Sequence, residues 1–257
     1  MKGQREILSS HHSGPLRVHF IDEWRGVLIL YVILYHLLYD LAVLFPPDIP
    51  WMFSDWMETL RDTMTGMLIF ISGISCRFSH SNALRGGRLL LIALALTLVT
   101  WLVMPEQLII FGILHFFSVS MLLYALLERL LRPVPPWWGA GISLLLFFTT
   151  YRLRVGHLGI IRPLVFQLPE GLRENFLCFV LGLPTQGFSS ADYYPLLPWI
   201  FLFLAGSFIG PLLQEGRAPA FFYQRHVRWL AFTGRHTLLL YLVHQPVLLA
   251  ILTLIYH

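Results

Sequence analysis

Charged residues are scarce in this chain. They make up 12% of its 257 residues, whereas hydrophobic residues make up 56%, and the mean hydropathy is +0.67. This balance is far from the composition of a soluble globular domain. The apolar runs are continuous rather than alternating, which argues against a membrane β-barrel. The sequence therefore predicts an all-α, polytopic bundle of membrane-spanning helices.

Several other signals are weak or missing. The only cysteines are Cys76 and Cys178, which excludes a disulfide framework and a cysteine-based zinc site. Residues 1–20 lack the apolar core of a cleavable signal peptide, so we expect the first span to insert uncleaved. No internal repeat is detectable, which counts against a transporter built from inverted halves. The net charge of +4 does not indicate nucleic-acid binding, because the positions of the arginines account for it.

Seven apolar segments are long enough to be transmembrane helices. They lie at 24–45, 57–76, 89–104, 108–128, 137–151, 195–213 and 230–255. A shorter apolar segment, 172–184, lies between Pro169 and Pro184 and predicts a re-entrant or interfacial helix. We expect a cytosolic tail at 1–20 and a single transmembrane domain at 21–257.

Positive charge is unevenly divided between the predicted loops. With seven spans and a cytosolic N-terminus, thirteen of the 18 Lys and Arg residues fall on the inner side. The outer ones are Arg61, Arg152, Arg154, Arg162 and Arg173. An excess of Arg and Lys in short cytoplasmic loops sets the orientation of a membrane protein. We therefore predict a protein of the inner membrane, with its N-terminus in the cytoplasm and its C-terminus outside.

The first span carries a polar stripe. Residues of one helical face recur there every three or four positions: Asp22, Arg25, Ile29, Ile33, His36 and Asp40. His36 lies about 16 Å from Arg25, at about 1.5 Å per residue. Asp40 can orient the imidazole of His36 and raise its basicity. The alternative is that both only hydrogen-bond to neighbouring helices, but burying them is costly, so we favour a functional site.

Two other spans carry a histidine near their centres. His115 lies one turn before two serines, and a packing role is as consistent with this position as a role in the site. His244 lies just before Pro246, which frees the carbonyl of Leu242 and predicts a helix break that lines a cavity. We therefore group His244 with His36 and keep His115 as a candidate.

Two segments at the predicted membrane surfaces are candidates for binding. At the outer end of the sixth span, ADYYPLLPW contains Asp192 and Trp199. An interfacial aromatic belt explains the aromatic residues of this segment but not its acid or its two prolines. At the inner surface, residues 72–88 include Arg77 and two further arginines. Arginines suit anionic phosphates, although the positive-inside bias is the simpler explanation for them.

Five segments follow one another in a recognisable order: RVHFIDEWRGVLILYVILYHLLYDL, FISGISCR, FGILHFFSVS, DYYPLLPW and GRHTLLLYLVHQP. Together they resemble bacterial members of the heparan-alpha-glucosaminide N-acetyltransferase catalytic-domain family, formerly a domain of unknown function. More distantly, the chain is similar to the wider transmembrane acyltransferases that modify surface sugars. The resemblance runs from about Arg17 to Leu252. It implies a bundle that takes acetyl-CoA from the cytosol and passes the acetyl group to a hydroxyl or amine of an extracytoplasmic glycan or other acceptor.

The chain departs from the lysosomal members at one important place. Those members have a histidine, held to be catalytic, in the loop after the first span. The corresponding loop here, residues 46–56, has no histidine, so that role is not transferred. His36 stands where the lysosomal members have a polar amide. The chain also has fewer spans and no large luminal domain, which makes heparan a poor expectation for its acceptor.

Acyl transfer inside the bundle is the leading hypothesis, and the polar residues would have roles in it. His36, oriented by Asp40, would deprotonate the acceptor, and His115 or His244 would donate a hydrogen bond to the oxyanion. Direct transfer in a ternary complex and transfer through an acetyl-histidine are both open.

The remaining candidates would bind substrates. Arg25, Asp22 and Arg77 would hold the acyl-CoA at the inner edge, and Asp192 and Trp199 would contact the acceptor. Acetyl-CoA is the expected donor, and no metal is required. A homodimer is left open by the sequence.

Two other function classes compete with acyl transfer. A proton-coupled transporter or flippase would use the three histidines and Asp40 as a proton relay. A cofactor protein would bind haem with two of the histidines or a metal with three. The lack of a repeat counts against the transporter, and the histidines lie on separate spans, which leaves a cofactor site without a predicted geometry.

Overall fold

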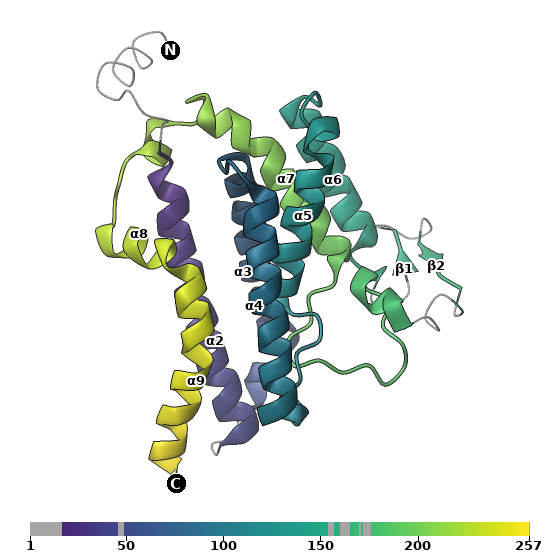
Figure 1. Ribbon diagram of the computed structural model, residues 1–257, viewed down its shortest axis with the longest axis vertical. Helices are drawn as coiled ribbons and strands as arrows, with labels where there is room; N and C mark the ends of the chain where they lie inside the picture. The colour runs from purple at the N-terminus through teal and green to yellow at the C-terminus, as the bar shows by residue number, and fades with distance from the viewer. Residues whose placement is uncertain are drawn as a thin grey trace. The chain divides into compact units, whose positions relative to one another are not determined.

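The structure, a computed structural model, describes residues 17–45, 49–153, 157–159, 165–169, 171 and 176–256. Most of the predicted N-terminal tail, residues 1–16, lies outside these residues, as do Arg154, Arg162 and Arg173. The described elements are α2 (His19–Leu44), η1 (Pro50–Phe53), α3 (Asp55–Arg77), α4 (Asn82–Val103), η2 (Pro105–Gln107), α5 (Ile113–Leu131), α6 (Pro136–Thr150), β1 (His157–Leu158), β2 (Phe166–Gln167), η5 (Phe176–Leu181), α7 (Leu196–Gln214), η6 (Ala220–Tyr223), α8 (Arg228–Arg235) and α9 (Thr237–Tyr256). The described residues therefore form helices and one short antiparallel strand pair, β1–β2 (Figure 1).

Five of these helices are long and apolar enough to cross a membrane: α2, α4, α5, α7 and α9. Helices also form at the other two predicted spans, but the count of seven crossings is not confirmed. The helix α3 carries Asp55, Glu58, Arg61 and Asp62 in its first turns, and α6 has only 15 residues. The described part of the 172–184 segment, residues 176–184, contains a short 3-10 helix, η5. A bilayer-spanning helix needs about 20 apolar residues.

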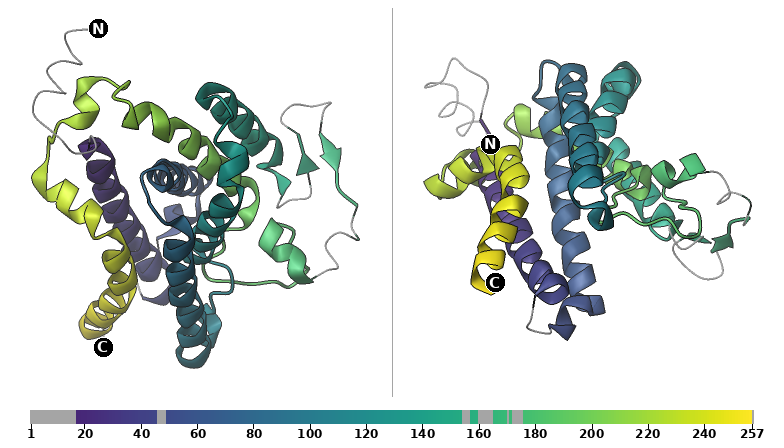
Figure 2. Two further views of the ribbon diagram at one scale, coloured as in Figure 1. Left: turned by 45° about the horizontal axis from the view of Figure 1, so that its top comes forward. Right: turned by 60° about the horizontal axis from the view of Figure 1, so that its bottom comes forward.

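The chain divides into two compact units. Unit 1 comprises residues 1–71 and 212–257, and unit 2 comprises residues 72–211. In unit 1, α9 lies beside α2, and α8 crosses the N-terminal half of α2 (Figures 1 and 2). In unit 2, α4 lies beside α5, and the β1–β2 hairpin follows α6.

The helices α2 and α9 run in the same direction. At one end of unit 1, Gly26 of α2 lies against the backbone of Leu230 in α8, which leads directly into α9. At the other end, the rings of Phe45 and Tyr256 have their centroids 5.4 Å apart. The start of α9 therefore lies at the same end of unit 1 as the start of α2.

Two glycines allow α2 and α8 to pack backbone to backbone. A Cβ atom on Gly26 would overlap the carbonyl oxygen of Leu230, and one on Gly234 would overlap the carbonyl oxygen of Asp22. Because backbone atoms cannot turn aside as a flexible side chain can, any larger residue would force the two helices apart.

We expect Gly26→Ala to lower the free energy of unfolding by about 1–3 kcal/mol, since the added methyl group overpacks this crossing. Gly87→Ala is the matched control, because no atom lies within 4 Å of the Cβ position at Gly87 in α4. Alanine is the better helix former, so the control is expected to be neutral or slightly stabilising. Thermal unfolding of both variants in detergent measures the difference. Equal melting temperatures would contradict the close crossing.

The segment between α7 and α8 is fixed by a buried tyrosine. The hydroxyl of Tyr223 donates to the carbonyl of Leu213 at 2.8 Å and accepts the N–H of Ala218 at 3.4 Å. Burial raises the pKa of Tyr223, so the phenol keeps the proton that it donates.

Candidate functional site

Unit 1 brings two of the predicted histidines together. The rings of His36 in α2 and His244 in α9 have their centroids 4.9 Å apart, with their planes at 61°. Both residues lie about midway along helices that are long and apolar enough to cross a membrane. The pairing of α2 with α9 thus places two imidazoles side by side within an apolar part of the protein.

The hydrogen bonding of His244 defines which of its nitrogen atoms is available. Its Nδ1 lies 2.6 Å from the carbonyl oxygen of Tyr241. A carbonyl oxygen only accepts, so Nδ1 must carry the proton, and the neutral ring then has its lone pair on Nε2. This Nε2 atom is buried and has no hydrogen-bond partner among the described residues. A neutral imidazole with this tautomer can accept a proton from a bound group.

The carboxylate of Asp40 is held by Gln245 rather than by His36. The side-chain Nε2 of Gln245 lies 2.9 Å from each oxygen of Asp40, which is only 2% exposed. This corrects the expectation that Asp40 orients the His36 ring: the amide donor satisfies the buried carboxylate, and His36 lies instead against His244. The Oε1 atom of Gln245 is also buried without a partner among the described residues.

Gln245 is the site residue that sequence reasoning missed. It is next to His244 in an otherwise apolar run, and a polar amide within a predicted membrane span already indicates a functional position. The helix α9 continues through Pro246, so the break predicted at this proline is absent from the described residues 237–256. A proline removes one donor from a helix without always ending it, because neighbouring groups can satisfy the freed carbonyl.

A chain of aromatic rings leads from His36 toward the far end of α2. Ring centroids are 6.0 Å apart for Tyr35 and His36, 6.4 Å for Tyr35 and Tyr39, and 6.3 Å for Tyr39 and Phe53. Exposed Trp51 and Trp56 stack on each other at that end, with centroids 6.0 Å apart. Aromatic rings thus form a series of contacts that extends from the two histidines toward the surface.

The predicted inner-edge residues lie at the start of α2. Asp22 accepts a hydrogen bond from Arg17 at 2.7 Å and lies 3.8 Å from the guanidinium of Arg25. The neighbouring Glu23, which the sequence analysis did not single out, is buried and accepts the backbone N–H groups of His226 and Val227 at 2.7 and 2.9 Å. Glu23 therefore fixes the chain just before α8.

His115 belongs to unit 2, where both of its ring nitrogens have partners. Its Nδ1 accepts the N–H of Gly112 at 3.3 Å, so the proton of the neutral ring is on Nε2. This Nε2 lies 3.2 Å from the hydroxyl of Thr97, which donates in turn to the carbonyl of Ile109 at 2.7 Å. The network ties the start of α5 to α4 and leaves no free lone pair on the ring, which favours the packing role.

The other unit 2 candidates also have structural partners. Asp192 accepts the N–H of Ile113 at 2.8 Å and so caps the start of α5, where backbone donors lack helical partners. Trp199 is buried among Phe147, Tyr151 and Tyr194, with ring centroids 5.6–6.4 Å from its own. These contacts position the 191–199 segment on unit 2.

Arg77 lies at the end of α3, in unit 2, and is half-buried. Its guanidinium is 3.4 Å from the hydroxyl of Tyr124 in α5. A Cβ atom on Gly210 of α7 would overlap the side chain of Arg77, so α7 packs closely over it.

The sequence of the chain matches one family model. The model for the heparan-alpha-glucosaminide N-acetyltransferase catalytic domain covers residues 17–246, which include every residue of the α2–α9 site. The chain belongs to this family. No curated protein and no solved structure matches the chain. As a member of the heparan-alpha-glucosaminide N-acetyltransferase family with helices suited to a membrane, it is related to enzymes that use acetyl-CoA as their donor.

We expect His115→Leu to lower the free energy of unfolding by about 1–3 kcal/mol, because it leaves the Gly112 N–H without its acceptor in a buried site. Acetyl transfer per folded molecule should stay near the wild-type rate. Thermal unfolding and an activity measurement on the same preparation test both parts, with exposed His80→Leu as the control. A stable but inactive His115→Leu variant would contradict a packing role.

Proposed function

We propose that the protein is a membrane-embedded acetyltransferase that moves an acetyl group from acyl-CoA to a hydroxyl or amine of an extracytoplasmic glycan or other acceptor. Membership of the acetyltransferase family supports the reaction class. The observation that carries the site assignment is the buried, unpartnered Nε2 atom of His244.

His244, rather than His36 as the sequence analysis expected, is the proposed general base, because its Nε2 atom is buried without a partner among the described residues. Its Nδ1–H group is held by the Tyr241 carbonyl, which fixes the tautomer and the direction of the ring. The Nε2 lone pair takes the proton of the acceptor O–H or N–H group, and the acceptor heteroatom then attacks the thioester carbonyl. The carbon–sulfur bond breaks, and the proton ends on the CoA thiol. An acetyl-histidine route would use the same lone pair on the thioester carbon instead.

Gln245 and Asp40 are proposed to position the acceptor. The NH₂ group of Gln245 donates to both oxygens of Asp40, so its Oε1 atom points away from that carboxyl group. The site then presents two buried acceptors, Oε1 of Gln245 and Nε2 of His244. A hydroxyl or amine supplies the donor that such acceptors lack.

The two ends of unit 1 suit different substrates. Arg25 lies at the end where α2 and α9 begin, near exposed arginines of the α8 segment. By the positive-inside rule we assign this end to the cytoplasm, and Arg25 and Asp22 are proposed to bind the donor there. The acceptor is proposed to approach from the opposite end, along the rings of Tyr39 and Tyr35.

The remaining sequence candidates are not part of this proposal. They belong to unit 2 and each has a structural contact there: Arg77, His115, Asp192 and Trp199.

Labelled acetyl-CoA supplied to membranes that contain the protein tests this function. We expect release of free CoA thiol together with transfer of label to a membrane or soluble acceptor, and D-glucosamine serves as an added amine probe. Membranes without the protein are the control. Proton flux in proteoliposomes that is unaffected by acetyl-CoA, without thiol release, would support the transporter instead. Label that stays on denatured protein when no acceptor is present would indicate the acetyl-histidine route.

A further inference from the structure

The short helix α8 has two unlike faces. Its buried residues are small, Ala231 and Gly234, and the Gly234 backbone packs directly on α2. Its exposed side carries Trp229 and Phe232, which are 61% and 58% exposed, together with Arg228 and Arg235. Large apolar rings and arginines thus share the surface of α8 that faces away from α2.

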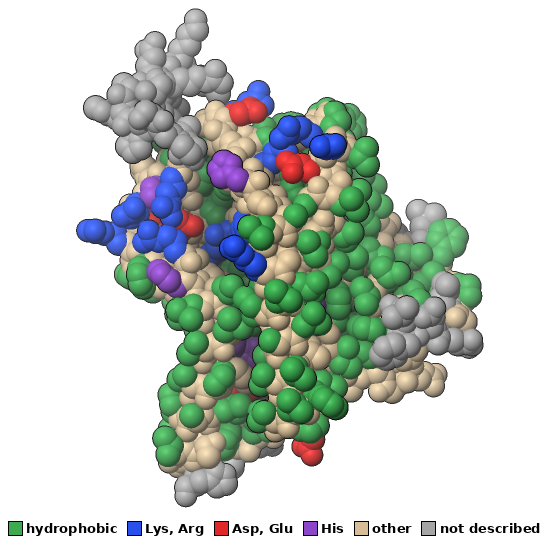
Figure 3. Space-filling model, in the orientation of Figure 1, with side chains coloured by type: hydrophobic (Ala, Val, Ile, Leu, Met, Phe, Trp, Pro, Cys, Tyr) green, Lys and Arg blue, Asp and Glu red, His purple; other side chains and the backbone are tan. Residues whose placement is uncertain are grey.

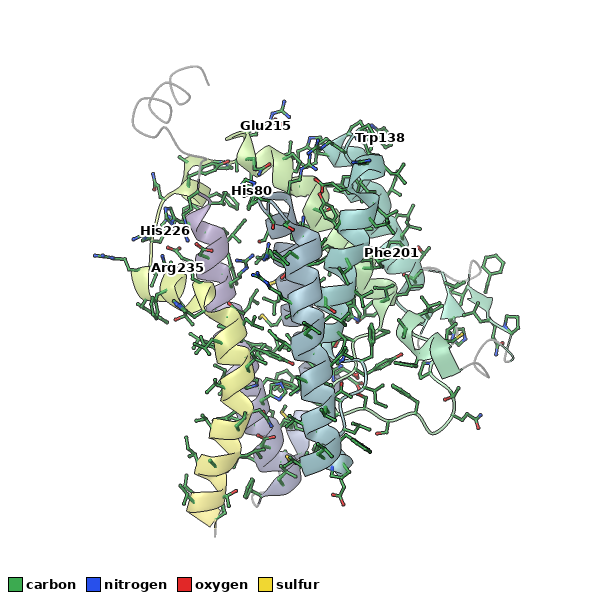
Figure 4. All side chains as sticks on the ribbon, viewed as in Figure 1. His80, Trp138, Phe201, Glu215, His226 and Arg235 are labelled. Carbon is green, nitrogen blue, oxygen red and sulfur yellow. The ribbon has the colours of Figure 1, made fainter. Side chains whose placement is uncertain are left out.

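The charged side chains of this segment are of one sign. Arg225 precedes α8, Arg228 and Arg235 lie in it, and residues 224–236 contain no acidic residue, while the ring of His226 lies 3.2 Å from the carboxylate of Glu23. Figure 3 shows Lys and Arg side chains gathered over α8, whereas none is visible on the face of α9 drawn below it. Figure 4 labels His226 and Arg235 close to each other at α8.

The position of α8 within unit 1 relates this surface to the bilayer. The helix is followed after one residue by α9, and it crosses the start of α2. Both α9 and α2 are long and apolar enough to cross a membrane. When α2 and α9 cross the bilayer, a helix at their common end is expected at the depth of the lipid headgroups.

The nearby carboxylates do not neutralise the arginines of α8. Glu23 binds the backbone N–H groups of His226 and Val227, and Asp22 is paired with Arg17 and lies near Arg25. The contact of Glu23 also holds α8 in place against α2. Arg228 and Arg235 are both exposed on this firmly placed helix, and the Nε of Arg235 donates to the carbonyl of Ala231 at 3.2 Å.

We propose that α8 is a docking surface for the headgroups of anionic phospholipids. The guanidinium groups of Arg228 and Arg235 would bind lipid phosphates, for which their planar, multiple donors are suited. Trp229 and Phe232 enter the interface between headgroups and acyl chains, where aromatic rings are favoured. The surface fixes the depth of α9 and is independent of the acetyl-transfer chemistry.

Native mass spectrometry tests the proposal. The full-length protein is released from nanodiscs of phosphatidylcholine that contain 30% phosphatidylglycerol, about one lipid in three. We expect the wild type to retain phosphatidylglycerol in preference to phosphatidylcholine. The double variant R228Q/R235Q should retain it at least about fivefold less, and 1 M salt (roughly a 3 Å screening length) should weaken retention by the wild type.

The matched control is R132Q/R217Q, which removes the same charge from two exposed arginines that are already near glutamates. Arg132 lies 3.7 Å from Glu128, and Arg217 lies 3.3 Å from Glu215. The control should retain phosphatidylglycerol like the wild type.

Equal retention of both lipids by the wild type, or an equal loss in the control, would overturn the proposal. A loss of acetyl-CoA binding in R228Q/R235Q with lipid retention unchanged would also overturn it, because the arginines would then serve the donor. Thermal unfolding of each variant identifies any loss that comes from misfolding.

Discussion

Replacing His244 by alanine is expected to lower the rate of acetyl transfer by about 100- to 10,000-fold, the usual contribution of a general base. The variant loses the only ring nitrogen that the structure shows to be buried and unpartnered among the described histidines. Its fold should survive, since the lost hydrogen bond to Tyr241 is local to one helix. Thiol release from acetyl-CoA, normalised to folded protein, measures the effect.

Two further histidine variants make this result specific. His36→Ala should reduce the rate less than His244→Ala, because His36 contacts the base without fixing its tautomer. His80→Ala, at an exposed position outside the site, should leave the rate unchanged. Full activity in a folded His244→Ala variant would remove this residue from the mechanism even though the family assignment stands.

Gln245→Leu should be the most damaging substitution for stability in unit 1. It leaves the buried carboxylate of Asp40 without its two hydrogen bonds, which we expect to cost about 2–4 kcal/mol of unfolding free energy. The double variant D40L/Q245L should recover much of that loss, because replacing both partners of a buried polar pair removes the unmet charge.

Comparing the single with the double variant shows how much of the loss comes from the Asp40–Gln245 pair itself. Thermal unfolding in detergent, followed by tryptophan fluorescence, measures the stability of the wild type, of Gln245→Leu and of D40L/Q245L. If D40L/Q245L is less stable than Gln245→Leu alone, the two side chains do not form an isolated buried pair. Both variants should also transfer acetyl groups more slowly, since the Oε1 acceptor of Gln245 is gone.

The helices were predictable from the sequence because long apolar runs leave the backbone few alternatives in a membrane. The all-helical class is confirmed, and the family that the ordered segments resembled is the one that the chain belongs to. The number of crossings was less predictable. Both α3 and α6 form helices, but charges in the first turns of α3 and the short length of α6 leave them outside the five helices that are long and apolar enough to cross a membrane, so the predicted count of seven is not confirmed.

The candidate site was predictable only in part. The stripe on α2 pointed to His36 and Asp40, and the motif on α9 pointed to His244, but periodicity within one helix cannot reveal which residue of another helix it meets. The pairing of Asp40 with Gln245 depends on the parallel packing of α2 and α9, which no local pattern encodes. For the same reason, His115 looked equivalent to the other histidines until its contacts with Gly112 and Thr97 were seen.

The central claim is tested most directly by a cryo-electron microscopy structure of the full-length protein with a ketone analogue of acetyl-CoA. In this analogue a methylene group replaces the sulfur. The proposed site predicts the ketone carbonyl in unit 1, beside the rings of His36 and His244 and within reach of a nucleophile bound to Nε2 of His244. An analogue whose ketone lies beside His115 and Asp192, or anywhere away from the α2–α9 histidines, would contradict it.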